Sequence, residues 1–226
     1  LYGLAYSIGM LVQLFISGMN SALTPWMYSK IKKGDIRSMR KVLQLLSIVV
    51  VGIAVALMLI SPELVLIFGS PKYREAVYVI PPVAASVFFI FIYNILSMPQ
   101  FYYEKTQFLM AASMAAAGAN VVLNFIFIRL FGYIAAGYTT LACYMLYSVG
   151  HYIVSKRILV NEGIQENLMS PGFLVACSVF LIGASIICNL IFPYRILRYA
   201  ILLASAGLVF WKKELLLKTM ADIRKK

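Results

Sequence analysis

The sequence predicts an all-α fold, a polytopic membrane helix bundle with about seven transmembrane helices. The 226 residues are 62% hydrophobic and only 12% charged, with a mean hydropathy of +0.89. Soluble domains are about 45–50% apolar and about 25% charged. The charged residues gather in short blocks, and most stretches between them are long enough for the roughly 20 apolar residues with which a helix crosses a bilayer.

Seven windows that are free of charge, or nearly so, are the expected transmembrane helices. In chain order they are Leu1–Tyr28, Val42–Pro62, Ala76–Tyr103, Thr106–Ile128, Leu130–Ser155, Asn167–Tyr194 and Ile196–Trp211. The last window is short, so it can span only if Arg198 and Lys212 extend to opposite membrane interfaces. Because the chain starts inside the first window, we expect that an N-terminal part precedes it.

One basic block sets the expected orientation in the membrane. Ser29–Lys41 holds six basic residues and one acid. With the linkers after the third and fifth windows and the C-terminal tail, it places 15 of the 20 basic residues on one side. The positive-inside rule makes that side cytoplasmic. A nucleic-acid surface is disfavoured, because no aromatic residues are interleaved with the cations.

Two prolines interrupt the third window near its expected outer end. Pro81 and Pro82 either kink a helix that lines a cavity, or mark the first turn of a helix that begins there, with Ala76–Ile80 as an outer loop. Past the last window, Leu216, Met220 and Ile223 are spaced for an amphipathic helix along the cytoplasmic interface. A solvated tail is the alternative. The sequence leaves both pairs of readings open.

Uncharged polar side chains inside the windows are the candidate substrate-cavity residues. They are Gln13, Asn20, Asn94, Asn120, Asn124 and His151. An amide left unpaired in hydrocarbon is costly, so these groups must face one another or a hydrated cavity. Gln13 and Asn20 share one helix face, and so do Asn120 and Asn124. Both hydrogen bonding between helices and a cavity lining are compatible with this spacing.

Other kinds of site are not indicated by the sequence. All eight acidic residues lie in linkers or at window edges, so no window carries the mid-membrane charge typical of an ion-coupled site. Cys143, Cys177 and Cys188 are isolated within apolar windows, which predicts neither a metal site nor a disulfide. The linkers are short and hold no nucleotide fingerprint or nucleophile–base pair. We therefore expect no metal, no cofactor and no enzyme activity.

Three motifs occur in a characteristic order along the chain. Ser21–Asp35 reads SALTPWMYSKIKKGD, Ile60–Ala84 reads ISPELVLIFGSPKYREAVYVIPPVA, and Asn120–Thr140 reads NVVLNFIFIRLFGYIAAGYTT. Together with the hydropathy pattern, they resemble the C-terminal half of a polysaccharide flippase. Such flippases belong to the multidrug/oligosaccharidyl-lipid/polysaccharide exporter superfamily, and the resemblance extends over nearly the whole chain.

The resemblance implies two six-helix lobes around a central cavity, often with two extra C-terminal helices. Residues 1–155 would form five helices of the C-terminal lobe, residues 156–211 the two additional transmembrane helices, and residues 212–226 a basic cytoplasmic tail. The implied function is transfer of undecaprenyl-diphosphate-linked oligosaccharide across the cell (cytoplasmic) membrane. The implied partners are this lipid-linked oligosaccharide, membrane lipid and a missing N-terminal lobe, and no nucleic acid is expected.

The residues fit this substrate in part. The candidate amides suit sugar hydroxyls, whereas a diphosphate needs cations. We expect those at the cytoplasmic rim: Lys30, Lys32, Lys33, Arg37, Arg40 and Lys41. The rim either helps to capture the diphosphate or serves only as a topology signal. A multidrug exporter of the same fold is an alternative, but an exporter of cationic drugs is expected to have carboxylates in its cavity. A membrane-embedded glycan polymerase or ligase is another, but it usually needs a large outer loop.

Overall fold

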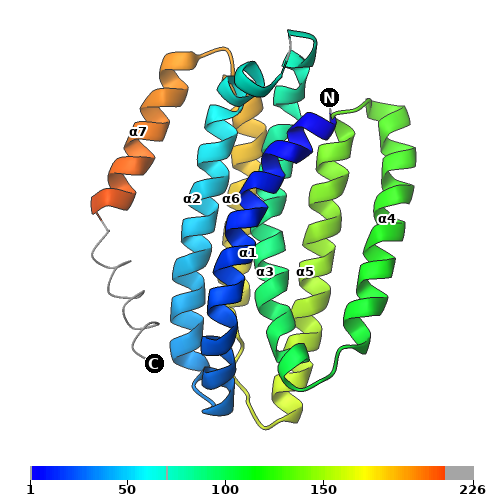
Figure 1. Ribbon diagram of the computed structural model, residues 1–226, viewed down its shortest axis with the longest axis vertical. Helices are drawn as coiled ribbons and strands as arrows, with labels where there is room; N and C mark the ends of the chain where they lie inside the picture. Colours follow the sequence, from blue (N-terminus) through cyan, green and yellow to red (C-terminus); the bar gives the residue numbers. More distant parts are fainter. Residues whose placement is uncertain (1, 70, 212–226) are drawn as a thin grey trace.

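The computed structural model describes residues 2–69 and 71–211 and confirms the all-α fold. Successive helices run up and down the bundle, so their connections alternate between its two ends (Figure 1). The elements are α1 (Tyr2–Lys32), α2 (Ile36–Phe68), the 3₁₀ helix η1 (Pro71–Tyr78), α3 (Ile80–Tyr102), α4 (Gln107–Phe131), α5 (Ala135–Asn161), α6 (Pro171–Ile191) and α7 (Arg195–Trp211). The predicted tail, residues 212–226, lies outside the described residues.

Among the described residues, five segments are long and apolar enough to cross a membrane by themselves. They are Gly3–Lys32, Ile36–Phe68, Tyr73–Tyr102, Gln107–Phe131 and Pro171–Ile191. α5 is more polar, but it runs beside α3 along the bundle (Figure 1). Packing against other helices there replaces contact with lipid, which explains how α5 tolerates its polar side chains. α7 is short, with 17 residues, as its window predicts.

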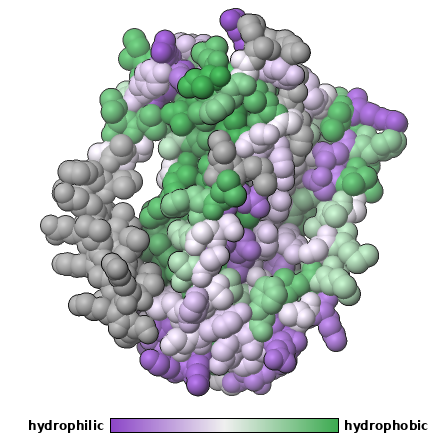
Figure 2. Space-filling model, in the orientation of Figure 1, coloured by the Kyte–Doolittle hydropathy of each residue, from purple (hydrophilic) through white to green (hydrophobic). Residues whose placement is uncertain are grey.

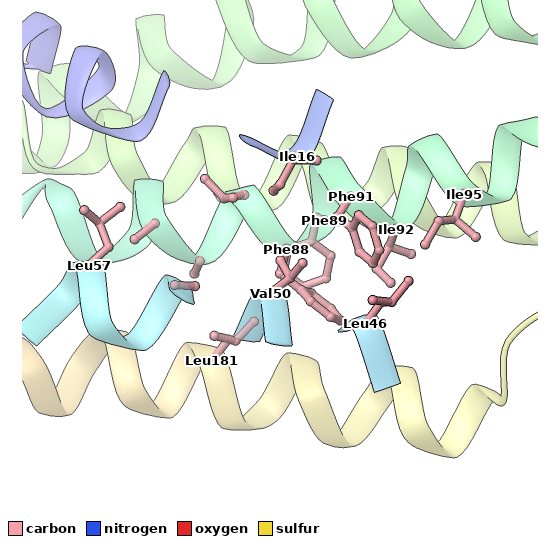
Figure 3. Packing of buried hydrophobic residues seen from close by; sticks show 14 of the residues in the cluster. Ile16, Leu46, Val50, Leu57, Phe88, Phe89, Phe91, Ile92, Ile95 and Leu181 are labelled. Carbon is pink, nitrogen blue, oxygen red and sulfur yellow. The ribbon is translucent and has the colours of Figure 1, made fainter. Parts of the chain in front are cut away.

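α3 forms the centre of the bundle. Every residue from Ile80 to Ile92 is buried. α3 packs most extensively against α5, and next against α1 and α2. Its Phe88 lies in one hydrophobic cluster with Val50 of α2 and Leu181 of α6 (Figure 3). The continuous apolar run of the third window is therefore a helix surrounded by protein.

The two prolines of the third window start a helix and do not kink one. α3 begins at Ile80, with Pro81 and Pro82 in its first turn. The backbone N–H groups of a first turn have no partner within the helix, so proline loses little there. The preceding α2–α3 connection contains η1. This decides between the two readings of the sequence in favour of the helix start.

Arg198, which the seventh window would place at a membrane interface, is held by a neighbouring helix; its position relative to the membrane stays a prediction, and Lys212 lies outside the described residues. The Arg198 side chain is only 4% exposed and donates hydrogen bonds to both carboxylate oxygens of Glu63, at 2.8 and 2.9 Å. It also donates to the Leu59 carbonyl oxygen at 2.7 Å. Glu63 lies inside α2, which continues past the expected edge at Pro62 as far as Phe68. The two charges neutralise each other between α2 and α7.

The three linkers predicted to be cytoplasmic meet at one end of the bundle, the lower end in Figure 1. Arg40 Nε donates to the Asn167 carbonyl oxygen at 2.7 Å, which ties the α1–α2 turn to the α5–α6 linker. Lys105 Nζ donates to Glu162 Oε1 at 2.8 Å, which ties the α3–α4 turn to the end of α5. Figure 2 shows hydrophilic side chains along this end. That it faces the cytoplasm stays a prediction.

Candidate functional site

A cavity of about 440 Å³ lies between α1, α3, α4 and α5. α3 and α5 pack closely together, and α4 packs against α5 but makes few contacts with the other helices. Four tyrosines line the cavity: Tyr6 of α1, Tyr93 of α3, and Tyr144 and Tyr147 of α5. The small residues Ala116 and Ala117 of α4 leave the space open on the opposite side.

Three of these tyrosines, Tyr93, Tyr144 and Tyr147, form a connected aromatic surface. Tyr93 and Tyr144 are stacked, with ring centroids 6.2 Å apart and ring planes 6° from parallel. The Tyr147 ring lies 4.7 Å from that of Tyr93 at 59°. Its hydroxyl is 2.7 Å from that of Ser113 on α4, which bridges two cavity walls. Each tyrosine combines an apolar face with a polar tip, so the surface offers both stacking and hydrogen bonding.

The predicted amide pair of α4 has a structural role and a cavity role. Asn124 Nδ2 donates to Asn120 Oδ1 at 2.9 Å, and Thr139 Oγ1 of α5 donates to Asn124 Oδ1 at 2.5 Å. Asn120 also lines the cavity. Asn124 thus joins α4 to α5, and Asn120 lies on the cavity wall; that Asn120 contacts a substrate there stays a prediction.

The other predicted cavity residues do not line this space. Gln13 is half-buried on α1, and Asn20 is buried with its Oδ1 lacking a hydrogen-bond partner among the described residues. Asn94 Nδ2 donates to the Ile90 carbonyl oxygen of its own helix at 2.7 Å. His151 is fully buried behind Tyr93 and Tyr147. Of the six candidates, the structure places only Asn120 on the described wall of this cavity.

The cationic rim divides into engaged and exposed side chains. Lys30 is buried and pairs with Asp35 Oδ2 at 2.5 Å. This contact holds the pKa of the Asp35 carboxyl at about 2, well below its ordinary value of 3.8. Asp35 also caps α2 by accepting from the Ser38 N–H. Arg40 binds the α5–α6 linker as described above. The exposed members are Lys32, Lys33, Arg37 and Lys41, and of these Arg37 also lies 3.6 Å from Glu166 Oε1 in a solvent-exposed ion pair.

The turn that carries these cations is specified locally. Gly34 has a φ of +66°, a left-handed conformation that glycine adopts without strain. Its N–H donates to the Ile31 carbonyl oxygen at 3.0 Å and thereby helps to close the end of α1. Asp35 then begins α2 as its N-cap. The short Gly-Asp turn thus sets Lys32 and Lys33 on one side and Arg37 on the other.

The sequence did not single out Tyr6 or Tyr93 as cavity residues. Tyr93 precedes Asn94 in the middle of an apolar window, and Tyr144, Tyr147 and His151 follow one another at spacings of three and four. That spacing places the last three on one helix face. A polar aromatic stripe on a membrane-spanning helix was the available signal. What the sequence could not show is that Tyr93 of α3 meets this stripe.

The comparison with protein families decides the broad class. A family model described as MatE matches residues 1–126, which is more than half of the chain. The chain belongs to the MatE family. MatE proteins are membrane exporters, so the chain is a multi-pass membrane transporter and not an enzyme of the glycan polymerase or ligase kind. Comparison with curated proteins found no match, and comparison with solved structures found none either.

Proposed function

We propose that this MatE protein is a flippase that moves lipid-linked oligosaccharide across the cytoplasmic membrane. The observation that carries the proposal is the composition of the cavity wall. Its described lining consists of tyrosine, amide, hydroxyl, thiol and small apolar side chains, without a charged group. Sugar rings carry hydroxyls that both donate and accept hydrogen bonds, and Asn120, Ser113 and Tyr147 offer the same capacity.

Aromatic faces add a second form of recognition. The apolar face of a pyranose ring packs on an aromatic ring, and the stacked pair Tyr93–Tyr144 presents such a surface within a membrane-spanning bundle. A cavity of about 440 Å³ has room for a small number of sugar units. The lipid tail would remain in the bilayer while the sugars pass through the polar cavity, as alternating access at a membrane midplane allows.

The diphosphate would be met at the inner rim. Four cations are exposed there: Lys32, Lys33, Arg37 and Lys41. Lys32 is the last residue of α1, and Lys33 follows directly after it. Lys30 and Arg40 are left out of this role, because Asp35 and Asn167 already engage them. Exposed lysine and arginine side chains attract anionic headgroups by about 1 kcal/mol each.

A multidrug exporter of the same family is the second candidate. The observation that favours it is again the tyrosine surface, because aromatic rings bind organic cations through cation–π contacts. Its weakness is the absence of a carboxylate from the described cavity lining. An organic cation moved into this space would lack a counter-ion, whereas a neutral glycan needs none.

The proposal is tested by removing the aromatic surface. We expect the double variant Tyr93→Leu, Tyr144→Leu to lose export of surface polysaccharide and to accumulate lipid-linked oligosaccharide on the inner leaflet. Tyr194→Leu is the matched control, because Tyr194 is 64% exposed at the α6–α7 turn. Wild-type export by the double variant, present at wild-type amounts in the membrane, would contradict the proposal.

A further inference from the structure

A second, separate space lies between α5 and α6. Both helices pack against α3, but they make few contacts with each other, and the groove between them has a volume of about 190 Å³. Each wall is one stripe of side chains at helical spacing: Met145, Ser148, Val149 and Tyr152 on α5, and Pro171, Leu174, Val175 and Ser178 on α6. The floor is formed by Phe88, Phe89 and Ile92 of α3 (Figure 3).

The walls offer no free hydrogen-bond donor along most of their length. Ser148 Oγ donates to the carbonyl oxygens of Phe89 and Tyr144, at 3.0 and 2.9 Å. Ser178 Oγ donates to the Leu174 carbonyl oxygen at 2.7 Å. The other lining side chains are apolar up to the last turn of the groove. The groove therefore suits a hydrocarbon chain and not a sugar, whose hydroxyls would find no partner there.

Polar atoms without partners gather at one end of the groove, toward the lower end of the bundle in Figure 1. Tyr152 Oη, Ser155 Oγ and Asn167 Oδ1 are buried and have no hydrogen-bond partner among the described residues. Ser155 is 1% exposed and follows Tyr152 by three positions, so the two lie on one side of α5. Buried polar groups are nearly always hydrogen-bonded, so these atoms indicate that a polar group binds nearby.

Two cations lie at the same end. Arg40 Nε donates to the Asn167 carbonyl oxygen at 2.7 Å, and its charge acts on Tyr152, so the guanidinium lies near both. Its two terminal NH₂ groups have no hydrogen-bond partner among the described residues. Lys156 is exposed and follows Tyr152 by four positions, which continues the α5 wall by one turn. The acidic residues of the linker pair elsewhere: Glu162 with Lys105 and Glu166 with Arg37.

The first turn of α6 favours an anion at this end as well. α6 begins at Pro171, which lines the groove, and the N-cap Ser170 makes no side-chain capping hydrogen bond. No acidic residue lies in this first turn. The N–H groups of a first turn lack partners within the helix, and the helix dipole attracts negative charge to them. A phosphate here would meet the helix end and both cations together.

We propose that the groove holds one acyl chain of an anionic phospholipid, with the phosphate bound by Arg40, Lys156 and the N-terminus of α6. From its first to its last side chain each wall rises about 10 Å, which fits within the roughly 15 Å of hydrocarbon in one leaflet. In the predicted orientation this is the inner leaflet, which carries anionic lipid. A helix is about 10 Å wide and too thick for a space of this volume. The proposal does not depend on which substrate the cavity carries.

Native mass spectrometry of the purified protein in detergent tests the site with two probe lipids. Phosphatidylglycerol and phosphatidylcholine with identical acyl chains are titrated, and the fraction of protein with one bound lipid gives the two dissociation constants. We expect wild type to bind phosphatidylglycerol at least about fivefold more tightly, because one cation near an anionic headgroup supplies that ratio. Equal binding of the two lipids overturns the proposal, and this result needs no variant to fold.

Two pairs of variants locate the binding site. Lys156→Gln should lower the preference for phosphatidylglycerol by about fivefold, whereas Arg157→Gln removes the neighbouring exposed charge outside the groove stripe and should keep it. Val175→Phe fills the groove and should weaken binding of phosphatidylglycerol. Val121→Phe is its control on α4, because Val175 and Val121 are 61% and 69% exposed. Thermal melting without added lipid confirms that each variant is folded.

Unchanged phosphatidylglycerol binding in folded Lys156→Gln and Val175→Phe would overturn the proposal. Two other occupants would overturn it as well. One is a polyprenyl lipid that co-purifies with wild type in place of a phospholipid. The other is a second copy of the chain, seen as a dimer that Val175→Phe separates and Val121→Phe does not.

Discussion

Glu63 and Arg198 form a two-pronged ion pair that joins α2 to α7. Both guanidinium NH groups contact the carboxylate, and the Tyr199 hydroxyl donates to Glu63 Oε1 at 2.9 Å. α7 has few other contacts with the bundle, mainly with α2 and α6. The pair therefore both neutralises two charges in an apolar region and attaches the last described helix.

Removing one partner of this pair should be costly. Arg198→Met leaves the Glu63 carboxylate without its counter-ion, and we expect a loss of about 3–5 kcal/mol in stability. Thermal unfolding in detergent, or protease sensitivity of the α6–α7 turn, measures it. Glu63→Leu combined with Arg198→Met should recover much of the loss, because no unpaired charge remains. Equal losses in the single and double variants would mean that the pair is not a coupled unit.

The Lys30–Asp35 contact predicts an acid-dependent loss of stability. The folded-state pKa of Asp35, about 2, lies below the ordinary value of 3.8. The folded state thus binds fewer protons than the unfolded state between these values, and the contribution is complete above about pH 4 and lost toward pH 2. Because Asp35 is partly exposed, we expect about 1 kcal/mol at most.

Asp35→Asn measures this contribution directly. At pH 6 to 7 the variant should melt below wild type, and the two melting curves should converge as the pH falls toward about 2. Asp222→Asn, in the C-terminal tail, serves as a charge-matched control. Asparagine can keep the N-cap hydrogen bond, so a difference between Asp35→Asn and wild type that is independent of pH would contradict the assignment to the carboxylate charge.

The exposed rim cations should matter beyond orientation if they receive the diphosphate. Lys32→Gln, Lys33→Gln and Arg37→Gln together leave Lys30, Arg40 and Lys41 for the positive-inside rule, so the topology should survive. Flipping in reconstituted vesicles should fall, and wild-type flipping should decline as salt rises through about 0.15 M, where the Debye length is about 8 Å. If the triple variant flips at the wild-type rate at low salt, the basic block Ser29–Lys41 serves only as a topology signal.

Gln13 and Asn20 remain a predicted pair on one face of α1. Asn20 is buried, and its Oδ1 has no hydrogen-bond partner among the described residues, which calls for an explanation beyond packing. We expect Gln13→Leu with Asn20→Leu to abolish polysaccharide export while the protein stays folded in the membrane. A cell-surface polysaccharide assay with membrane-fraction quantification measures both, and normal export would make the pair dispensable.

Much of the fold was readable from charge-free windows, because burial in lipid imposes long apolar runs bounded by charges. The ends of helices were less readable. α2 passes Pro62 and Glu63, because Arg198 of a helix 135 residues away supplies the counter-ion. No local sequence pattern predicts such a distant partner. The expected window ended at Pro62, because an unpaired acid at the next position, Glu63, would have ended the membrane span.

The candidate site was predictable only in part, for a related reason. Asn120 was found because an amide in an apolar run is costly wherever it lies. Tyr93 was not, because a tyrosine in such a run is equally compatible with lipid, an interface or a core. Its role depends on contacts with Tyr144 and Tyr147 of another helix. These contacts form only when α3 packs against α5, so the sequence alone does not reveal them.

The identity of the substrate is tested most directly by transport in vesicles that hold the purified protein and nothing else. The protein should move lipid-linked oligosaccharide from one leaflet to the other, measured by accessibility of the glycan to an added glycan-modifying enzyme, and Asn120→Leu should slow this transfer. The same vesicles should show no protein-dependent movement of a cationic dye. Dye movement without oligosaccharide transfer would contradict the account and favour the multidrug exporter.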